Sequence, residues 1–151
     1  MSIEDDIAFL ERVPTLAILG HEALRILAIG AESRYLHDGE LLFQAGDPAD
    51  AGFVVQEGSF NLAAGPADTT ALAVGPGTLL GEFALLTETT RPVTATAVEP
   101  STVIRIPRTL FLKMLEGYPQ AAMRLRENIL ARTDQSAREI EQVRGVLDGQ
   151  R

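Results

Sequence analysis

Residues 79–97 read LLGEFALLTETTRPVTATA and form the one stretch of the chain in which charges interrupt a run of apolar and small residues. Glu82 and Arg91 stand nine residues apart in this stretch. A guanidinium offers a permanent charge and paired donors to a phosphate, and a nearby carboxylate accepts hydrogen bonds from sugar hydroxyls. The pair therefore suits the ribose phosphate of a nucleotide. An internal ion pair between Glu82 and Arg91 is the plainer alternative.

The backbone of the same stretch predicts an anion-binding concavity. If Gly81 ends a strand and residues 82–86 form a helical turn, the free N–H groups of Phe83 and Ala84 point outward. We expect Arg91 to close over an anion held at this turn.

Glycine and proline indicate that the surrounding region is a β domain. Eight of the 13 glycines lie between Gly39 and Gly81, and six of the eight prolines lie between Pro48 and Pro107. Short apolar stretches at such close turn spacing are typical of an all-β sandwich or barrel. The predicted strands span residues 41–43, 52–56, 60–63, 70–74, 93–98 and 102–106.

Helical patterns lie on both sides of this region. Apolar residues recur every three or four positions from Ile3 to Leu27, and Pro14 is predicted to separate two short helices. After the β region, residues 108–115 are predicted to form a short helix that Gly117 closes.

A long final helix is predicted over residues 119–148, because Pro119 suits a first helical turn and no other proline follows. Residues at alternating three- and four-residue steps along it are Ala122, Leu125, Ile129, Thr133, Ser136, Ile140, Val143 and Leu147. A period near 3.5 is typical of a coiled coil, so we expect a parallel homodimer, with Thr133 and Ser136 as a polar break. An ordinary helix that packs against its own domain is the alternative.

The composition restricts the function classes. The 151 residues, 46% of them hydrophobic, suffice for one domain. The net charge of −8 repels nucleic acid and anionic membranes, so we expect neither as a direct partner. The chain has no cysteine, which excludes disulfides and thiolate chemistry. The apolar runs are short and the N-terminus is acidic at Glu4, Asp5 and Asp6, so we expect a cytoplasmic protein.

The sequence carries no sign of catalysis or of a metal. His21 and His37 are the only histidines, and they lack the spacing of metal ligands. No Ser-His-Asp arrangement stands out, and residues 75–77 lack the lysine that follows in a phosphate-binding loop. We therefore expect neither a metal cofactor nor an enzyme.

Residues 79–97 resemble the phosphate-binding cassette of the cyclic nucleotide-binding domain family, the module of bacterial catabolite activators, of regulatory subunits of cAMP-dependent kinase and of cyclic nucleotide-gated channels. Its turn positions match Gly39-Glu40, Gly46-Asp47, Gly58 and Pro76-Gly77, and the resemblance covers roughly residues 7–148. It implies a mainly β fold with flanking helices, a jelly roll or double-stranded β-helix, formed as a single domain over residues 1–151. N-terminal helices would occupy residues 1–31, the β-roll residues 32–107 and the C-terminal helices residues 108–148.

The resemblance also implies a role for each cassette position. Glu82 would bind the ribose 2′-hydroxyl and Arg91 the cyclic phosphate, with Gly81 and the Ala84 amide at the pocket floor. In the family, the residue after the arginine donates its N–H to the phosphate, and a Thr or Ser there favours cGMP. Pro92 has neither group, which removes a hydrogen bond worth about 1.5–3 kcal/mol. We therefore expect cAMP as the ligand, cGMP less readily, and modest affinity.

Other positions complete the expected pocket. Phe83, Val93 and Thr94 lie in or just after the cassette and are candidates to line it. The last helix of the family often contacts the base, and Thr133 and Ser136 are the hydroxyls placed for this. A helix interface that merely tolerates Thr133 and Ser136 explains them equally well.

The expected function is a regulatory module that binds a cyclic nucleotide and signals through its C-terminal helices. Bacterial activators of the family continue into a helix-turn-helix, and this chain ends at Arg151, so the output would pass to an effector protein. The alternative is a nucleotide-free interaction or dimerisation module that has kept the fold and lost the ligand.

Overall fold

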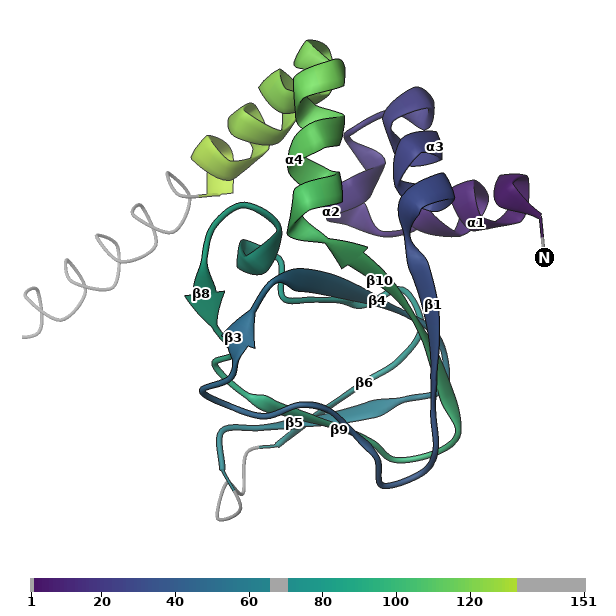
Figure 1. Ribbon diagram of the computed structural model, residues 1–151, viewed down its shortest axis with the longest axis vertical. Coiled ribbons are helices and arrows are strands. Elements are labelled where there is room, and N and C mark those ends of the chain that lie inside the picture. Colours follow the sequence, from purple (N-terminus) through teal and green to yellow (C-terminus); the bar gives the residue numbers. More distant parts are fainter. Residues whose placement is uncertain (1, 66–70, 133–151) are drawn as a thin grey trace, which may run out of the picture.

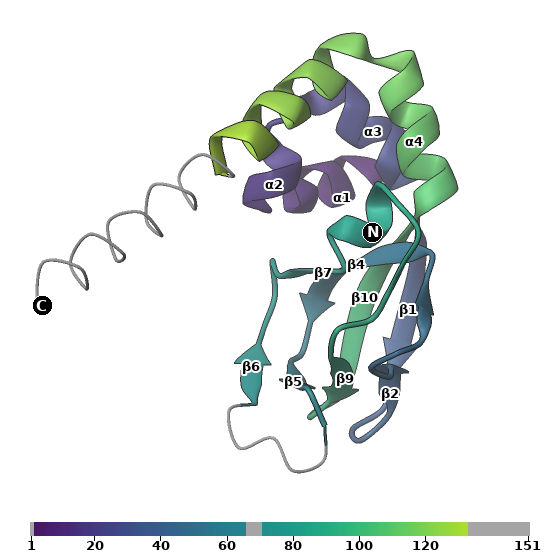
Figure 2. The same cartoon turned by 90° about the vertical axis from the view of Figure 1, so that its left-hand side faces the viewer.

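The computed structural model describes residues 2–65 and 71–132 of the chain. A β-roll forms one end of the molecule, and helices from both ends of the chain pack together on the other end (Figures 1 and 2). This arrangement confirms the predicted fold class, a mainly β jelly roll with flanking helices.

Three helices precede the roll where two were predicted. They are α1 (Ile3–Leu10), α2 (Pro14–Ala17) and α3 (His21–Gly30). Pro14 begins the second helix, since its fixed φ suits a first turn. A second break at Gly20 was missed. Gly20 is the N-cap of α3 and has φ +93°, a left-handed conformation that glycine adopts without steric cost and that separates α3 from α2.

The strands pair antiparallel in two four-stranded sheets, ordered β1-β10-β4-β7 and β2-β9-β5-β6, and β3 pairs with β8. Their bounds are β1 (Glu32–Leu36), β2 (Leu41–Phe43), β3 (Pro48–Ala49), β4 (Ala51–Glu57), β5 (Phe60–Ala63), β6 (Leu72–Val74), β7 (Leu79–Leu80), β8 (Thr89–Thr90), β9 (Thr94–Ala97) and β10 (Ser101–Pro107).

The six predicted strands are all present, with ends that differ by up to two residues. The start of the one predicted over residues 70–74 falls partly outside the described residues. Four strands were missed: β1, β3, β7 and β8. Four of the five residues of β1 are exposed, so it has no apolar pattern, and the other three strands have only two residues each.

Helix α4 (Arg108–Gly117) leaves β10 directly, and a further helix follows from residue 119 to the last described residue, 132. The predicted start of the next helix at Pro119 is confirmed, whereas α4 runs to Gly117, two residues past its predicted end at residue 115. Thr133, Ser136 and the rest of the predicted helix to residue 148 lie outside the described residues.

The described part of the predicted coiled-coil seam packs against the chain itself. Leu125 belongs to the buried core, and Ile129 packs against that core. The large apolar residues exposed on this helix are instead Met123 and Leu130. The alternative, a helix folded against its own domain, is correct for residues 119–132, and the homodimer stays a prediction.

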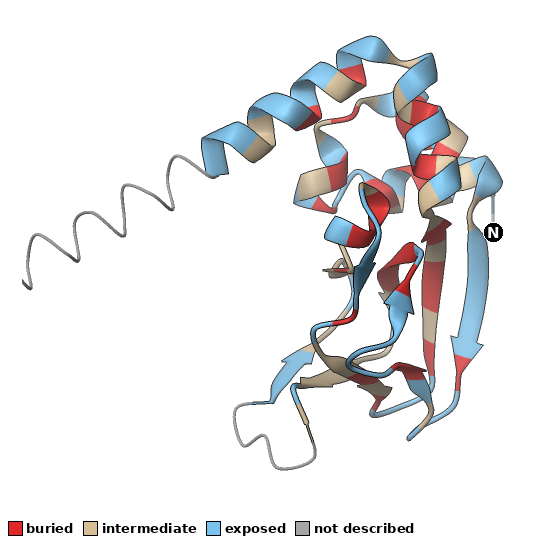
Figure 3. Cartoon of the chain, turned by 60° about the vertical axis from the view of Figure 1, so that its left-hand side comes forward, coloured by how far each residue is buried: buried red, intermediate tan, exposed pale blue. Residues whose placement is uncertain are grey.

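Buried apolar side chains form two clusters. One joins the helices to the adjacent sheet and includes Leu24, Leu27 and Phe111. The other fills the inside of the roll and includes Phe53 and Phe60. Figure 3 shows where the buried residues lie along the helices and along the strands of the roll. No helix among the described residues is long and apolar enough to cross a membrane.

Candidate functional site

A cavity of about 470 Å³ opens on the roll beside the 3₁₀ helix η1 (Phe83–Leu85) and the β3-β8 pair. Its walls are mostly apolar. The predicted site residues that line it are Gly81, Glu82, Phe83, Ala84, Arg91, Pro92 and Val93. The fold thus brings these predicted cassette residues together around one cavity. Thr94 does not line the cavity, and its hydroxyl accepts a hydrogen bond from the Ala45 N–H, 2.9 Å away.

Arg91 is the buried charge of this cavity, with a relative exposure of 5%. Its Cζ lies 4.4 Å from the ring centroid of Phe43 and 5.3 Å from that of Phe53. Its Nη2 donates to the Ala51 carbonyl at 2.8 Å. Its Nη1 is buried and has no hydrogen-bond partner among the described residues. A buried donor without an acceptor costs free energy, so this nitrogen is suited to an anionic oxygen from a ligand.

The surroundings of Arg91 act on its proton affinity in opposite directions. Burial lowers the pKa of the Arg91 guanidinium, while the carboxylates of Asp50 and Asp47 raise it and the charge of Arg105 lowers it. A guanidinium keeps its proton at neutral pH, so Arg91 remains a cation. Because the side chain is shielded from water, its charge acts strongly on any anion that enters the cavity.

Gly81 leaves room for the guanidinium of Arg91 to approach the backbone closely. Its φ of +80° is left-handed, and a Cβ built on it would collide with Nη1 of Arg91. Glycine is therefore favoured at residue 81, because a side chain there would strain the backbone and displace the guanidinium of Arg91. The strand before it, β7, was not among the six predicted strands, but its end at Leu80 fits the expectation that a strand ends at Gly81.

The turn after Gly81 is shorter than predicted, and its amides are used differently. The Ala84 N–H donates to the Gly81 carbonyl at 3.1 Å, so the prediction of a free amide at Ala84 is wrong for this structure. The tighter bonding of a 3₁₀ turn ties up this donor. The N–H groups of Glu82 and Phe83 have no acceptor among the described residues, and they are the donors that the turn leaves open.

Glu82 has a partner that the sequence did not indicate. Arg132, on the helix over residues 119–132, donates from Nη2 to Oε1 at 2.5 Å and from Nη1 to Oε2 at 3.2 Å. The predicted alternative, an ion pair between Glu82 and Arg91, is wrong. The hydrogen bond to Glu82 raises the pKa of Arg132. Fifty residues separate the partners, and no local motif marks such a pair.

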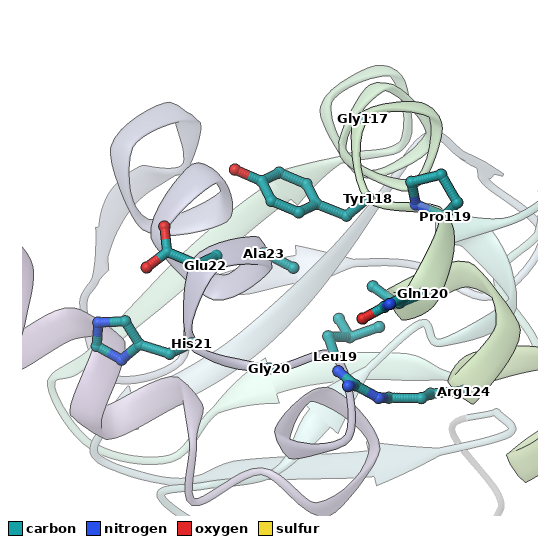
Figure 4. A pocket seen from close by; sticks show the side chains of 11 residues that line it. Leu19, Gly20, His21, Glu22, Ala23, Gly117, Tyr118, Pro119, Gln120 and Arg124 are labelled. Atoms are coloured by element: carbon teal, nitrogen blue, oxygen red, sulfur yellow. The ribbon is translucent and has the colours of Figure 1, made fainter.

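A second cavity, of about 610 Å³, lies between the start of α3 and the joint between α4 and the following helix (Figure 4). It is larger, but the side chains of His21, Glu22 and Arg124 in its lining are all exposed. Within the described residues, Nη1 of Arg91 is the one buried side-chain nitrogen or oxygen that lacks a partner. The cavity around Arg91 is therefore the candidate site.

The two histidines have surface contacts of their own. His21 lies 3.1 Å from Glu11, and the ring of His37 packs edge-on against Tyr35. Over residues 2–65 and 71–132, no group of three His, Asp or Glu side chains is arranged to hold a metal ion.

A family model described as the cyclic nucleotide-binding domain matches residues 33–118. Among solved structures, a cyclic nucleotide-binding-like protein from Brucella abortus is 39% identical, with a TM-score of 0.66 over 74% of this chain and 98% of that one. The N-terminal domain of a transcriptional regulator from Streptomyces coelicolor A3(2) is 28% identical, with a TM-score of 0.79 over 87% and 94% of the two chains.

Curated relatives carry a matching segment inside much longer chains. An uncharacterised NTE family protein of Mycobacterium tuberculosis is 33% identical over 116 residues, 76% of this chain and 20% of that protein. A lysophospholipase of Neurospora crassa is 29% identical over 100 residues, 64% of this chain and 7% of that protein. The chain thus spans a fifth or less of the length of these relatives.

Proposed function

The chain belongs to the cyclic nucleotide-binding domain family, and on this premise we propose that it is a regulatory module that binds cAMP in the cavity around Arg91. One observation carries the proposal: Arg91 is buried at the cavity, and its Nη1 has no partner among the described residues. A cyclic phosphate supplies the acceptor and the negative charge that this nitrogen lacks.

The ligand is placed by its chemistry. The phosphate binds Nη1 of Arg91 and the open amides of the turn, and the ribose hydroxyl binds the carboxylate of Glu82. The base occupies the apolar part of the cavity beside Leu62 and Val93. Pro92 provides no hydroxyl and no N–H, so cGMP gains nothing there and cAMP is preferred.

The signal passes to the C-terminal helices through Glu82. Arg132 ties the helix over residues 119–132 to the carboxylate that receives the ribose. A ribose hydroxyl at Glu82 changes the geometry of that ion pair, and the helix position that fits the bound state becomes the more populated one. An effector protein binds differently to the helices in their new position. The role proposed for the described residues is therefore regulation and not catalysis. The helices and the roll act as one domain in this scheme.

Calorimetric titration of cAMP and cGMP into refolded, nucleotide-free protein tests the proposal. We expect heat with cAMP, weaker binding of cGMP, and no binding by the Arg91→Ala variant. Arg34→Ala is the matched control, since Arg34 lies exposed on β1, away from the cavity. Circular dichroism checks that each variant is folded. Absence of heat with both nucleotides in the wild type contradicts the proposal.

A second candidate function is a nucleotide-free interaction module. It is favoured by the loss of two phosphate donors, since Pro92 has no N–H and the Ala84 N–H is bonded to Gly81. In that case Arg34→Ala, Arg91→Ala and the wild type behave alike in the titration, and binding of a partner protein is unaffected by nucleotide.

A further inference from the structure

Three consecutive carbonyls of the chain connect Arg91 to the first residue of α4. The Ala51 carbonyl accepts from Nη2 of Arg91 at 2.8 Å. The Asp50 carbonyl accepts from the backbone N–H of Arg108 at 2.8 Å. The Ala49 carbonyl accepts from Nη1 of Arg108 at 2.9 Å. A segment of only three residues therefore touches the ligand-binding guanidinium at one end and a helix N-terminus at the other.

The side chain of Arg108 also holds the cassette. Its Nη1 lies 3.3 Å from the Ala84 carbonyl in η1 and 2.9 Å from the Thr87 carbonyl, just after η1. One nitrogen thus contacts acceptors in β3, in η1 and in the following loop, sharing its two hydrogens among them. Pro107 precedes α4 and has no side-chain donor or acceptor, and the hydrogen bonds at the start of α4 come from the backbone N–H and the side chain of Arg108.

We infer that Arg108 is a positioning residue, which transmits the state of Arg91 and the cassette to α4; this rests on the proposed function. A phosphate at Nη1 of Arg91 redirects the guanidinium, and its bond to the Ala51 carbonyl changes with it. The displacement reaches α4 through the Asp50 and Ala49 carbonyls. Because the same Arg108 nitrogen contacts Ala84 and Thr87, the cassette and α4 move as one body.

Arg105 provides a matched control. Its Nη2 contacts the side chain of Asp50 at 3.3 Å, and its Nη1 lies 3.5 Å from Glu32. Arg105→Ala removes the same charge from the same neighbourhood but leaves the carbonyl bridge over residues 49–51 intact. Arg108→Lys keeps the charge and loses the forked donor geometry.

Hydrogen exchange with and without saturating cAMP tests the inference. In the wild type and in Arg105→Ala, we expect cAMP to slow exchange both in residues 81–90 and in residues 108–117. In Arg108→Ala, the response in residues 81–90 persists and the Kd for cAMP rises by less than about tenfold. The response in residues 108–117 becomes smaller, because only the bond from the backbone N–H of residue 108 to the Asp50 carbonyl remains. Arg108→Lys restores part of it. A full response of α4 in Arg108→Ala, or an equal loss in Arg105→Ala, overturns the inference.

A second experiment needs no ligand. It therefore distinguishes a failure of this inference from a failure of the proposed function. If cAMP does not bind the wild type, the proposed function fails, and the Arg91→Lys substitution takes the place of the ligand. We then expect Arg91→Lys to speed exchange at the first amides of α4 in the wild-type background and to have a smaller effect in the Arg108→Ala background, where only the backbone bond to the Asp50 carbonyl remains. Equal acceleration in both backgrounds, or none in either, overturns the inference.

Discussion

Arg91 and Gly81 are in such close contact that a Cβ on residue 81 would collide with Nη1 of the arginine. The nitrogen involved is the one without a partner among the described residues, so Gly81 keeps open the position at which an anion can be bound. The backbone conformation at Gly81 thus determines whether Arg91 can bind a ligand anion.

Gly81→Ala should abolish cAMP binding and lower stability. Gly77→Ala is the control, since Gly77 also has a left-handed φ, of +90°, but has open space around its Cα. Both variants should lose about 1–2 kcal/mol of unfolding free energy from backbone strain, and Gly81→Ala somewhat more from the collision. Urea unfolding and calorimetry measure the two effects. Wild-type affinity in Gly81→Ala would show that the arginine does not use this space.

Pro92→Ala should tighten cAMP binding. The substitution restores a backbone N–H next to Arg91, and a hydrogen bond to a charged group is worth about 1.5–3 kcal/mol, or roughly tenfold to a hundredfold in Kd. Pro92→Thr should in addition raise the affinity for cGMP relative to cAMP. Pro76→Ala, outside the cavity lining, serves as the control. Calorimetry measures the affinity of all three variants for cAMP and cGMP. Affinities of the two Pro92 variants equal to those of the wild type contradict the phosphate position proposed above.

Arg132→Ala should release the end of the helix over residues 119–132 from the cassette. Arg132 and Glu82 are partly exposed, so the global free energy of unfolding should fall by less than about 1 kcal/mol. Amide exchange near residue 132 should nevertheless accelerate, because both hydrogen bonds to Glu82 are lost. Arg126→Ala, exposed on the same helix, should leave exchange there unchanged. Equal acceleration in the two variants would assign the effect to the helix surface.

Phe111→Ala should cost about 3–5 kcal/mol of unfolding free energy, because Phe111 is 2% exposed and belongs to the core between the helices and the sheet. Phe83→Ala should leave stability nearly unchanged, since Phe83 is 74% exposed. The same substitution at a buried and at an exposed phenylalanine thus separates core packing from the cavity rim. Denaturant titration measures both, and similar losses would contradict the assigned core.

Much of the fold could be predicted from the sequence, because its signals are local. The strand over residues 101–107 is rich in β-branched residues between prolines, and the glycines fall at turns that need a left-handed backbone. The edge strand β1 was not predicted, because four of its five residues are exposed and it is held by backbone pairing to β10. Such a strand carries no apolar alternation.

The sequence by itself determined the family, the mainly β fold with flanking helices, and the presence of Glu82 and Arg91 in one short segment. Only the tertiary structure decided which atoms remain available there. It paired Glu82 with Arg132 rather than with Arg91, tied the Ala84 amide to Gly81, and left Nη1 of Arg91 without a partner among the described residues. Local patterns report backbone preference and burial, whereas the pairing of Glu82 with Arg132 depends on packing between segments fifty residues apart.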